Sequence, residues 1–104
     1  MKEYIDIEQL KKLPVNKLIN YAKRLQVVIE NEDNLNEERI NEICTTLSSK
    51  SNLYNLINIL GFPKMNYDED YRTWMVDFGN KREGFEQREL IDALFEAVIN
   101  RICL

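Results

Sequence analysis

The chain has 104 residues, of which 44% are hydrophobic and 31% are charged, which is enough apolar material for one core of ordinary domain size. It carries 14 Lys and Arg against 18 Asp and Glu, and a net charge of −4 has the wrong sign for a protein whose main task is to grip phosphate backbones. It contains no His, which excludes imidazole-dependent catalytic triads and most zinc sites. We therefore expect a single globular domain over residues 1–104 that acts by binding.

Residues 1–6 contain no apolar run of signal-peptide length, and nowhere do about 18 apolar residues follow one another, as a membrane span requires. We expect a cytoplasmic protein that does not interact with membranes. Cys44 and Cys103 have neither Cys-x-x-Cys spacing nor a histidine to complete a metal shell. In a reducing cytosol both thiols are expected to be reduced and largely buried.

Helical periodicity governs the first part of the chain. Asp6 and Gln9 have the spacing of a capping box, which predicts a short helix that ends by Leu13, because Pro14 disfavours helix before it. Pro14 is in turn well placed as the first residue of a second helix. The apolar residues that recur at helical spacing in this second helix are Val15, Leu18, Ile19, Ala22, Leu25 and Val28.

A polar, acidic stretch over residues 30–34 predicts an exposed loop before a third helix. Asn34 or Asn36 can cap this helix, whose acidic first turn suits the helix dipole. A fourth, shorter helix is predicted over residues 53–60, and Gly61-Phe62-Pro63 indicates that it ends in a Schellman-type turn. The apolar stripe of the third helix consists of Ile40, Ile43, Cys44 and Leu47.

The periodicity changes from helical to alternating after Pro63. Residues 71–78 predict a half-buried strand whose aromatic side meets the core. Its nearest partner is residues 64–67, joined to it by the acidic turn 68–70. Pairing with the strand edge of a second copy of the chain would satisfy the backbone equally, so a homodimer is an alternative.

The chain ends in a long amphipathic run that predicts a C-terminal helix. Together the patterns predict an α+β fold that is predominantly helical, with about five helices, one β-hairpin over residues 64–78 and this long C-terminal amphipathic helix. The predicted core face of the last helix consists of Leu90, Ile91, Leu94, Phe95, Val98 and Ile102.

Charge is unevenly distributed along the chain. Residues 1–28 carry six basic and three acidic side chains, whereas residues 29–47 carry one basic and six acidic ones. These charged side chains either lie on ordinary solvated helix faces, or the acidic ones form a docking surface for a basic partner. The candidate partner-binding residues are Glu30, Glu32, Asp33, Glu37, Glu38 and Glu42, the hairpin-turn residues Asp68, Glu69 and Asp70, and the neighbouring aromatic residues Tyr67, Tyr71 and Trp74.

The opening helix of SAP-like and Rho N-terminal-like helix-extended-helix modules resembles residues 10–25, Leu-Lys-Lys-Leu-Pro-Val-Asn-Lys-Leu-Ile-Asn-Tyr-Ala-Lys-Arg-Leu. With residues 36–47 as the second helix, the resemblance implies that architecture and nucleic-acid binding. The second helix of such modules tends to open with basic residues, but here it opens with Asn36, Glu37 and Glu38. Because carboxylates at that end repel phosphate, we expect the similarity to be architectural.

The C-terminal part of the chain is similar to short accessory proteins of phages and prophages, most of them of unknown function. The similarity lies in a Trp-bearing strand, a glycine turn and a final helix with the pattern Leu-Ile-x-Ala-Leu-x-x-Ala. The abundance of Asn, Ile, Leu and Lys is a bias that AT-rich coding produces. We expect the protein to come from a low-GC bacterium or one of its phages.

No catalytic, cofactor-binding or metal-binding residues are predicted. The acidic turn 68–70 lacks the glycine and alternating spacing of an EF-hand, and no base stands ready to activate the serines or cysteines. We therefore expect a non-enzymatic protein without a cofactor that binds and modulates or inhibits a protein partner. The alternative is a nucleic-acid-binding module that uses Lys11, Lys12, Lys17, Lys23 and Arg24.

Overall fold

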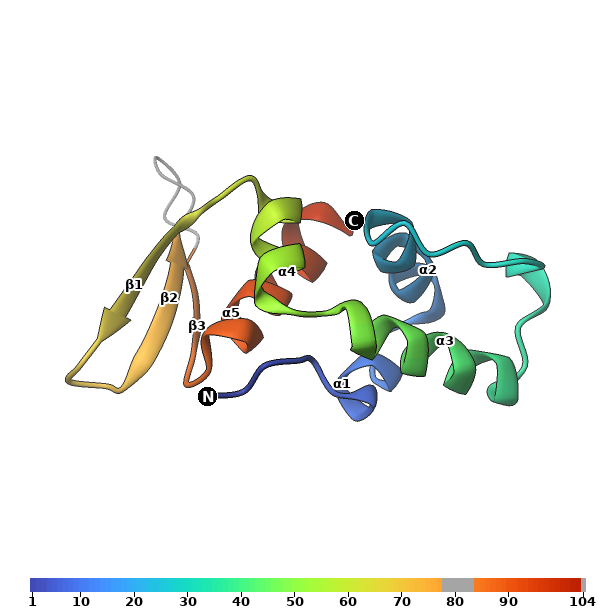
Figure 1. Ribbon diagram of the computed structural model, residues 1–104, viewed down its shortest axis with the longest axis horizontal. Coiled ribbons are helices and arrows are strands. Elements are labelled where there is room, and N and C mark those ends of the chain that lie inside the picture. The colour runs from blue at the N-terminus through green and yellow to red at the C-terminus, as the bar shows by residue number, and fades with distance from the viewer. Residues whose placement is uncertain (78–83, 104) are drawn as a thin grey trace.

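Helices and a small antiparallel sheet occupy different parts of an elongated molecule that measures 45 × 27 × 20 Å (Figure 1). The structure is a computed structural model that describes residues 1–77 and 84–103. Within these residues it contains five α-helices and three strands, which confirms the predicted helix-rich α+β fold. The sheet forms one end of the long axis, and the loop between the second and third helices forms the other.

Helix α1 (Ile7–Lys11) begins with the predicted capping box. The Asp6 carboxylate accepts a hydrogen bond from the Gln9 backbone N–H at 2.8 Å, and the Gln9 side chain accepts one from the Asp6 N–H at 3.1 Å. Pro14 is the residue before helix α2 (Val15–Arg24) rather than its first helical residue, because its backbone is still extended.

Helix α2 ends at Arg24, earlier than its apolar periodicity predicts. Gln26 has a φ of 61°, in the left-handed region. Its N–H donates to the carbonyl of Lys23 at 3.1 Å, and the N–H of Val27 donates to the carbonyl of Ala22 at 2.9 Å. These two bonds form a Schellman turn, which closes the helix without a glycine.

The early end of α2 changes which residues reach the core. Val28, a predicted member of the apolar stripe, lies beyond the helix and is 83% exposed, so that prediction is wrong. Val15, at the other end of the stripe, is also exposed. Tyr21, which the predicted stripe left out, is fully buried. The buried face of α2 consists of Leu18, Tyr21 and Ala22.

Helix α3 (Glu37–Lys50) follows a short 3-10 turn, η1 (Glu32–Asn34). Asn36, one of the two predicted caps, caps the helix by accepting a hydrogen bond from the Arg39 N–H at 2.8 Å. With 14 residues α3 is shorter than a bilayer span, and no helix in the described chain is long and apolar enough to cross a membrane. Its buried residues, Ile43, Cys44 and Leu47, belong to the predicted stripe.

Helix α4 (Leu53–Leu60) ends in the Schellman turn that the sequence predicts. Gly61 has a φ of 75°, and its N–H donates to the Asn58 carbonyl at 3.2 Å. The N–H of Phe62 donates to the Ile57 carbonyl at 3.0 Å, which completes the pair of bonds. Phe62 is 71% exposed, so the apolar contact that often accompanies this turn does not bury its ring.

The predicted hairpin is present, and a third strand extends it into a sheet of order β1-β2-β3. Strand β1 (Lys64–Asp68) pairs antiparallel with β2 (Thr73–Asp77) over the full length of both strands. Strand β3 (Gly84–Gln87), which the prediction of a single hairpin left out, pairs antiparallel with β2. Strand β3 has only four residues and begins with glycine, so its alternation of apolar and polar residues is too short to predict a strand. The predicted end of the hairpin at Phe78 lies outside the described residues.

One face of the sheet carries Met65 and Tyr67 of β1 together with Trp74 and Val76 of β2. Val76 is fully buried, which agrees with the prediction that this face meets the core. Helix α5 (Leu90–Ala97) packs against β2 and β3, while β1 contacts mainly β2. The sheet is therefore covered by the helix on its β2–β3 side and extends beyond it at β1.

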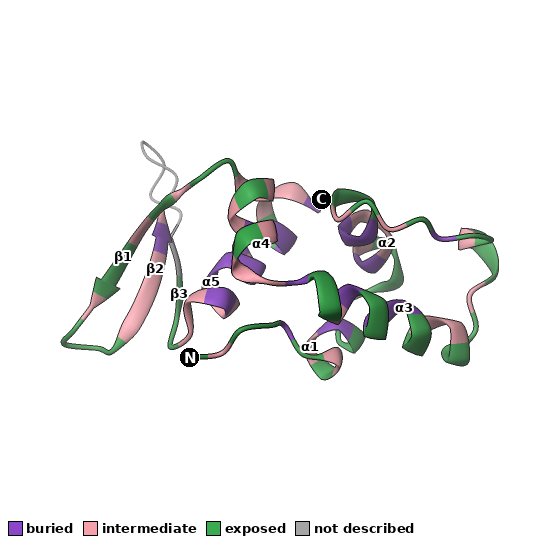
Figure 2. Ribbon diagram, viewed as in Figure 1, coloured by how far each residue is buried: buried purple, intermediate pink, exposed green. Residues whose placement is uncertain are grey.

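The C-terminal segment lies in the middle of the molecule (Figure 2). Helix α5 continues into a π-helical turn, η2 (Val98–Ile102), so the predicted long C-terminal helix is present over residues 90–102, with two departures from the simple pattern. It changes its winding at Val98, and it is buried on more than one side because α4 and the sheet both pack against α5. Its buried residues are Ile91, Ala93, Leu94, Phe95, Ala97, Val98 and Ile99.

Candidate functional site

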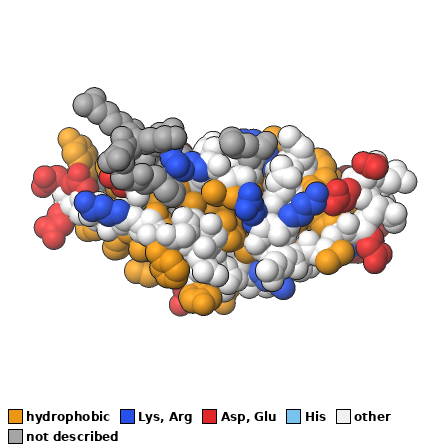
Figure 3. Space-filling view, turned by 90° about the horizontal axis from the view of Figure 1, so that it is seen from above, with side chains coloured by type: hydrophobic (Ala, Val, Ile, Leu, Met, Phe, Trp, Pro, Cys, Tyr) orange, Lys and Arg blue, Asp and Glu red, His pale blue; other side chains and the backbone are white. Residues whose placement is uncertain are grey.

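The two predicted acidic groups lie at opposite ends of the molecule, at the loop before α3 and at the β1–β2 turn (Figure 1). Figure 3 shows acidic side chains gathered at both ends of one face, with lysine and arginine side chains between them. Because the long axis measures 45 Å, the two groups do not form one surface. We call Glu30, Glu32, Asp33, Glu37, Glu38 and Glu42 the acidic end, and Asp68, Glu69 and Asp70 with Tyr67, Tyr71 and Trp74 the hairpin end.

Within residues 1–77 and 84–103, most carboxylates of the acidic end have no cationic partner. Glu32 lies 3.6 Å from the Lys23 ammonium, and Glu42 lies 2.9 Å from the Arg39 guanidinium. No ion pair within the described residues involves the other four, so this end keeps an excess of negative charge that attracts cations over several ångströms. These four exposed carboxylates belong to Glu30, Asp33, Glu37 and Glu38.

An apolar groove of about 370 Å³ adjoins the acidic end. It forms where the chain leaves α2 and turns toward η1, and its apolar lining comes from Val27, Val28 and Ile29. Val28 is 83% exposed there, whereas Ile29 is 9% exposed and packs on the core. The groove therefore places uncovered apolar surface beside the Lys23–Glu32 ion pair, at the start of the acidic end. Its lining consists of Lys23, Gln26, Val27, Val28, Ile29 and Glu32.

At the hairpin end, one of the three carboxylates has a structural role. Asp68 Oδ1 accepts hydrogen bonds from the backbone N–H groups of Asp70 at 2.9 Å and Tyr71 at 3.3 Å. This arrangement stabilises the turn between β1 and β2. Glu69 and Asp70 are exposed and remain accessible to a partner.

The aromatic residues of the hairpin end are not equivalent. The rings of Tyr67 and Trp74 are in contact across β1 and β2, with centroids 5.1 Å apart. Trp74 is half-buried and Tyr67 is 47% exposed, because β1 extends beyond α5. Tyr71 lies in the turn and is 76% exposed. The hairpin end thus offers aromatic surface as well as charge.

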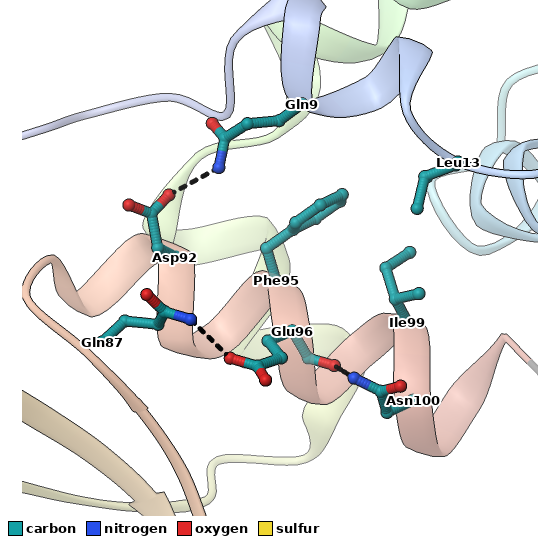
Figure 4. A pocket seen from close by; sticks show the side chains of 8 residues that line it. All are labelled: Gln9, Leu13, Gln87, Asp92, Phe95, Glu96, Ile99 and Asn100. Carbon is teal, nitrogen blue, oxygen red and sulfur yellow. Dashed lines mark hydrogen bonds between the residues drawn. The ribbon is translucent and has the colours of Figure 1, made fainter.

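A third site, a cleft of about 270 Å³, lies where α1 and β3 meet α5 (Figure 4). Two carboxylates one helical turn apart, Asp92 and Glu96, stand on its rim. Asp92 accepts hydrogen bonds from the Lys2 ammonium at 2.8 Å and the Gln9 amide at 2.9 Å. Glu96 accepts one from the Gln87 amide at 2.7 Å. The apolar part of the cleft consists of Leu13, Phe95 and Ile99.

This cleft is missing from the sequence prediction. Asp92 and Glu96 do share one face of the predicted last helix, which is the signal that could have indicated it. The partners Lys2, Gln9 and Gln87 come from distant parts of the chain and could not be paired with them from periodicity. In the structure these partners donate hydrogen bonds to both carboxylates. The polar groups of the cleft therefore link the N-terminal segment, α1 and β3 to α5, and neither carboxylate is available as a free acid or base.

Both cysteines of the described residues have buried thiol groups. Cys44 and Cys103 are free and buried. Burial raises the pKa of both thiols, and the nearby cations of Lys11 and Arg24 offset this only in part. A buried, protonated thiol is a poor nucleophile. No group of three metal-ligating side chains was found within residues 1–77 and 84–103.

Two of the basic side chains proposed for nucleic-acid binding already pair with carboxylates. The Lys11 ammonium lies 3.7 Å from Glu8, and the Lys23 ammonium lies 3.6 Å from Glu32. The acidic end combines carboxylates that have no described cationic partner with an apolar groove, so it is the strongest candidate site, followed by the hairpin end. Comparison with known proteins adds no relative: no protein-family model matches the chain, and neither does any curated protein or solved structure.

Proposed function

We propose that the protein is a cytoplasmic, non-enzymatic interaction protein that binds a basic surface of another protein through its acidic end, and so modulates or inhibits that partner. The observation that carries this proposal is the apolar groove beside the acidic end, where Val28 is 83% exposed. Full burial of a valine side chain is worth about 1.5–3 kcal/mol, so a partner that covers it gains affinity. The neighbouring carboxylates favour a partner whose apolar contact is surrounded by Lys or Arg.

The backbone at the groove supports the same proposal. Gln26 holds a left-handed conformation at a φ of 61°, which is unfavourable for a residue with a Cβ. Here the turn at Gln26 directs Val28 away from the core.

Nucleic-acid binding through the basic side chains of α1, α2 and the loop between them is the competing proposal. A phosphate backbone would have to displace carboxylates from Lys11 and Lys23, which weakens this alternative. A second copy of the chain is a further candidate partner, through the edge of the sheet. An origin in a phage or prophage is likewise a proposal that rests on the sequence resemblance alone.

The test is an NMR titration of the isotope-labelled protein with two probes: a short amphipathic peptide of leucine and lysine, and a duplex DNA. We expect the peptide to shift amide resonances of residues 26–38 and to bind more weakly as salt is added. We expect DNA to cause smaller shifts at the same concentrations. Larger shifts with DNA, centred on α1 and α2, would favour the nucleic-acid proposal instead.

Two matched triple variants separate the acidic end from the hairpin end, since each removes three negative charges. Glu30→Gln, Asp33→Asn and Glu38→Gln should slow peptide association and flatten its salt dependence, because exposed charges steer encounter but add little stability. Asp68→Asn, Glu69→Gln and Asp70→Asn should leave binding nearly unchanged. The reverse result would move the proposed site to the hairpin end.

A further inference from the structure

The outer edge of β1 is open in the described chain. The strand order is β1-β2-β3, so β1 has a paired strand on one side only. Alternate backbone N–H and C=O groups along Lys64–Asp68 therefore point away from the sheet. Three of its side chains, those of Lys64, Asn66 and Tyr67, are exposed. An edge of this kind can accept another strand.

The sequence of β1, Lys-Met-Asn-Tyr-Asp, is complementary to itself in the antiparallel direction. When Asn66 is set opposite Asn66 of a second copy, Lys64 faces Asp68 and Met65 faces Tyr67. Opposite charges directly across two strands attract, and a methionine beside an aromatic ring is a favourable pair. Each of these pairs occurs twice, because a two-fold axis relates the copies.

We propose that the protein forms a homodimer in which the β1 strands of two copies pair antiparallel about a two-fold axis at Asn66. The two three-stranded sheets then become one continuous sheet. In this register, each residue whose backbone N–H and C=O point outward in one copy lies opposite a residue whose N–H and C=O also point outward in the other copy, so the backbone groups can pair. A shift by one residue breaks this match, and a shift by two separates Lys64 from Asp68.

The joined sheet also extends the aromatic surface of the hairpin end. Opposite residues of an antiparallel pair point to the same face, so Met65 of one copy covers part of the exposed ring of Tyr67 in the other.

The acidic end lies at the far end of the long axis and stays accessible (Figure 1). Dimer formation and partner binding are therefore independent, and either proposal can fail without the other.

A disulfide across the axis tests the register. The Asn66→Cys variant sets two new thiols directly opposite each other, with Cα atoms about 4.5–5.5 Å apart, within the range that a disulfide spans. In the matched Lys64→Cys variant the two thiols lie four residues apart along the strands, about 14 Å. With oxidised glutathione we expect covalent dimer to form about tenfold faster, or more, in the Asn66→Cys variant. Equal rates would overturn the register, and the wild type with its buried Cys44 and Cys103 gives the background.

Charge exchange supplies the second test, read by analytical ultracentrifugation. Lys64→Glu should weaken the homodimer about tenfold, because both symmetric pairs become repulsive. Asp68→Lys should weaken it at least as much, because it makes the same pairs repulsive and also removes the acceptor of the two turn hydrogen bonds. A mixture of the two variants should restore dimer formation, since every facing pair is then of opposite charge. A wild type that stays monomeric at high concentration, or variants that dimerise as well as the wild type, would overturn the proposal.

Discussion

The phenolic hydroxyl of Tyr21 lies 2.7 Å from the Oγ of Ser51 in the buried interior. The Ser51 hydroxyl donates its only proton to the Leu47 carbonyl at 2.6 Å, so Tyr21 is the donor in the first bond. The backbone of Ser51 also accepts a bond from the Ile5 N–H at 3.1 Å. Ser51 thus joins α2, the end of α3 and the N-terminal segment, and burial is possible because its polar groups are satisfied.

We expect Tyr21→Phe to lower the free energy of unfolding by about 1–2 kcal/mol, because it removes the donor to a buried oxygen while the ring keeps its edge-to-face contact with Phe95. Urea unfolding followed by circular dichroism measures the loss. The matched control is Tyr54→Phe, at a tyrosine that is 71% exposed, where we expect a change within about 0.5 kcal/mol. Equal effects of the two variants would contradict a structural role for the Tyr21 hydroxyl.

Stability should fall at alkaline pH. Burial raises the pKa of Cys44, Cys103 and Tyr21 above the ordinary values of 9.0 for a thiol and 10.0 for a phenol. The unfolded chain therefore releases these protons at a lower pH than the folded chain does, so their contribution to stability is complete below about pH 9 and decreases above it. Urea unfolding from neutral pH to about pH 10 should show this decline. Cys44→Ala should make it shallower, and a wild type with no decline would contradict the burial of these groups.

Helices α2 and α4 show why one helix end could be predicted and the other could not. Both end in a Schellman turn with a left-handed residue, but only α4 places a glycine there, at Gly61. A glycine followed by Phe62 and Pro63 is a recognisable signal, whereas Gln26 is not. The apolar periodicity runs on to Val28, so the sequence predicts a longer helix than the backbone forms.

Gln26→Gly should raise the free energy of unfolding by about 0.5–1 kcal/mol. A left-handed conformation costs a residue with a Cβ about 1–2 kcal/mol, and the greater freedom of glycine in the unfolded chain offsets part of that gain. The converse variant, Gly61→Ala, should destabilise by about 1 kcal/mol. A Cβ at Gly61 would contact nothing within 4 Å, so backbone strain is the whole effect. A loss of stability in Gln26→Gly would show that the glutamine side chain itself stabilises the turn.

The candidate site shows a similar division between local and long-range information. The acidic residues and their two groupings could be read from the sequence, because charge runs are local. Their separation to opposite ends depends on how α3, α4 and the sheet are connected in space, which periodicity does not report. The groove beside Val28 follows from the unpredicted turn at Gln26, and the cleft at Asp92 depends on contacts with Lys2 and Gln9.

Leu94 and Val28 test this division directly, since apolar periodicity assigns both to the core. Leu94 is fully buried in α5 and Val28 is 83% exposed. We expect Leu94→Ala to lower the free energy of unfolding by about 2–5 kcal/mol, because it removes buried methyl groups and leaves a cavity in the core. Val28→Ala should change it by no more than about 0.5 kcal/mol, because nothing packs over this side chain in the free protein. Urea unfolding of both variants measures these changes. A small loss of unfolding free energy in Leu94→Ala would place α5 outside the core. A large loss in Val28→Ala would mean that the groove is closed in solution and is not a docking site.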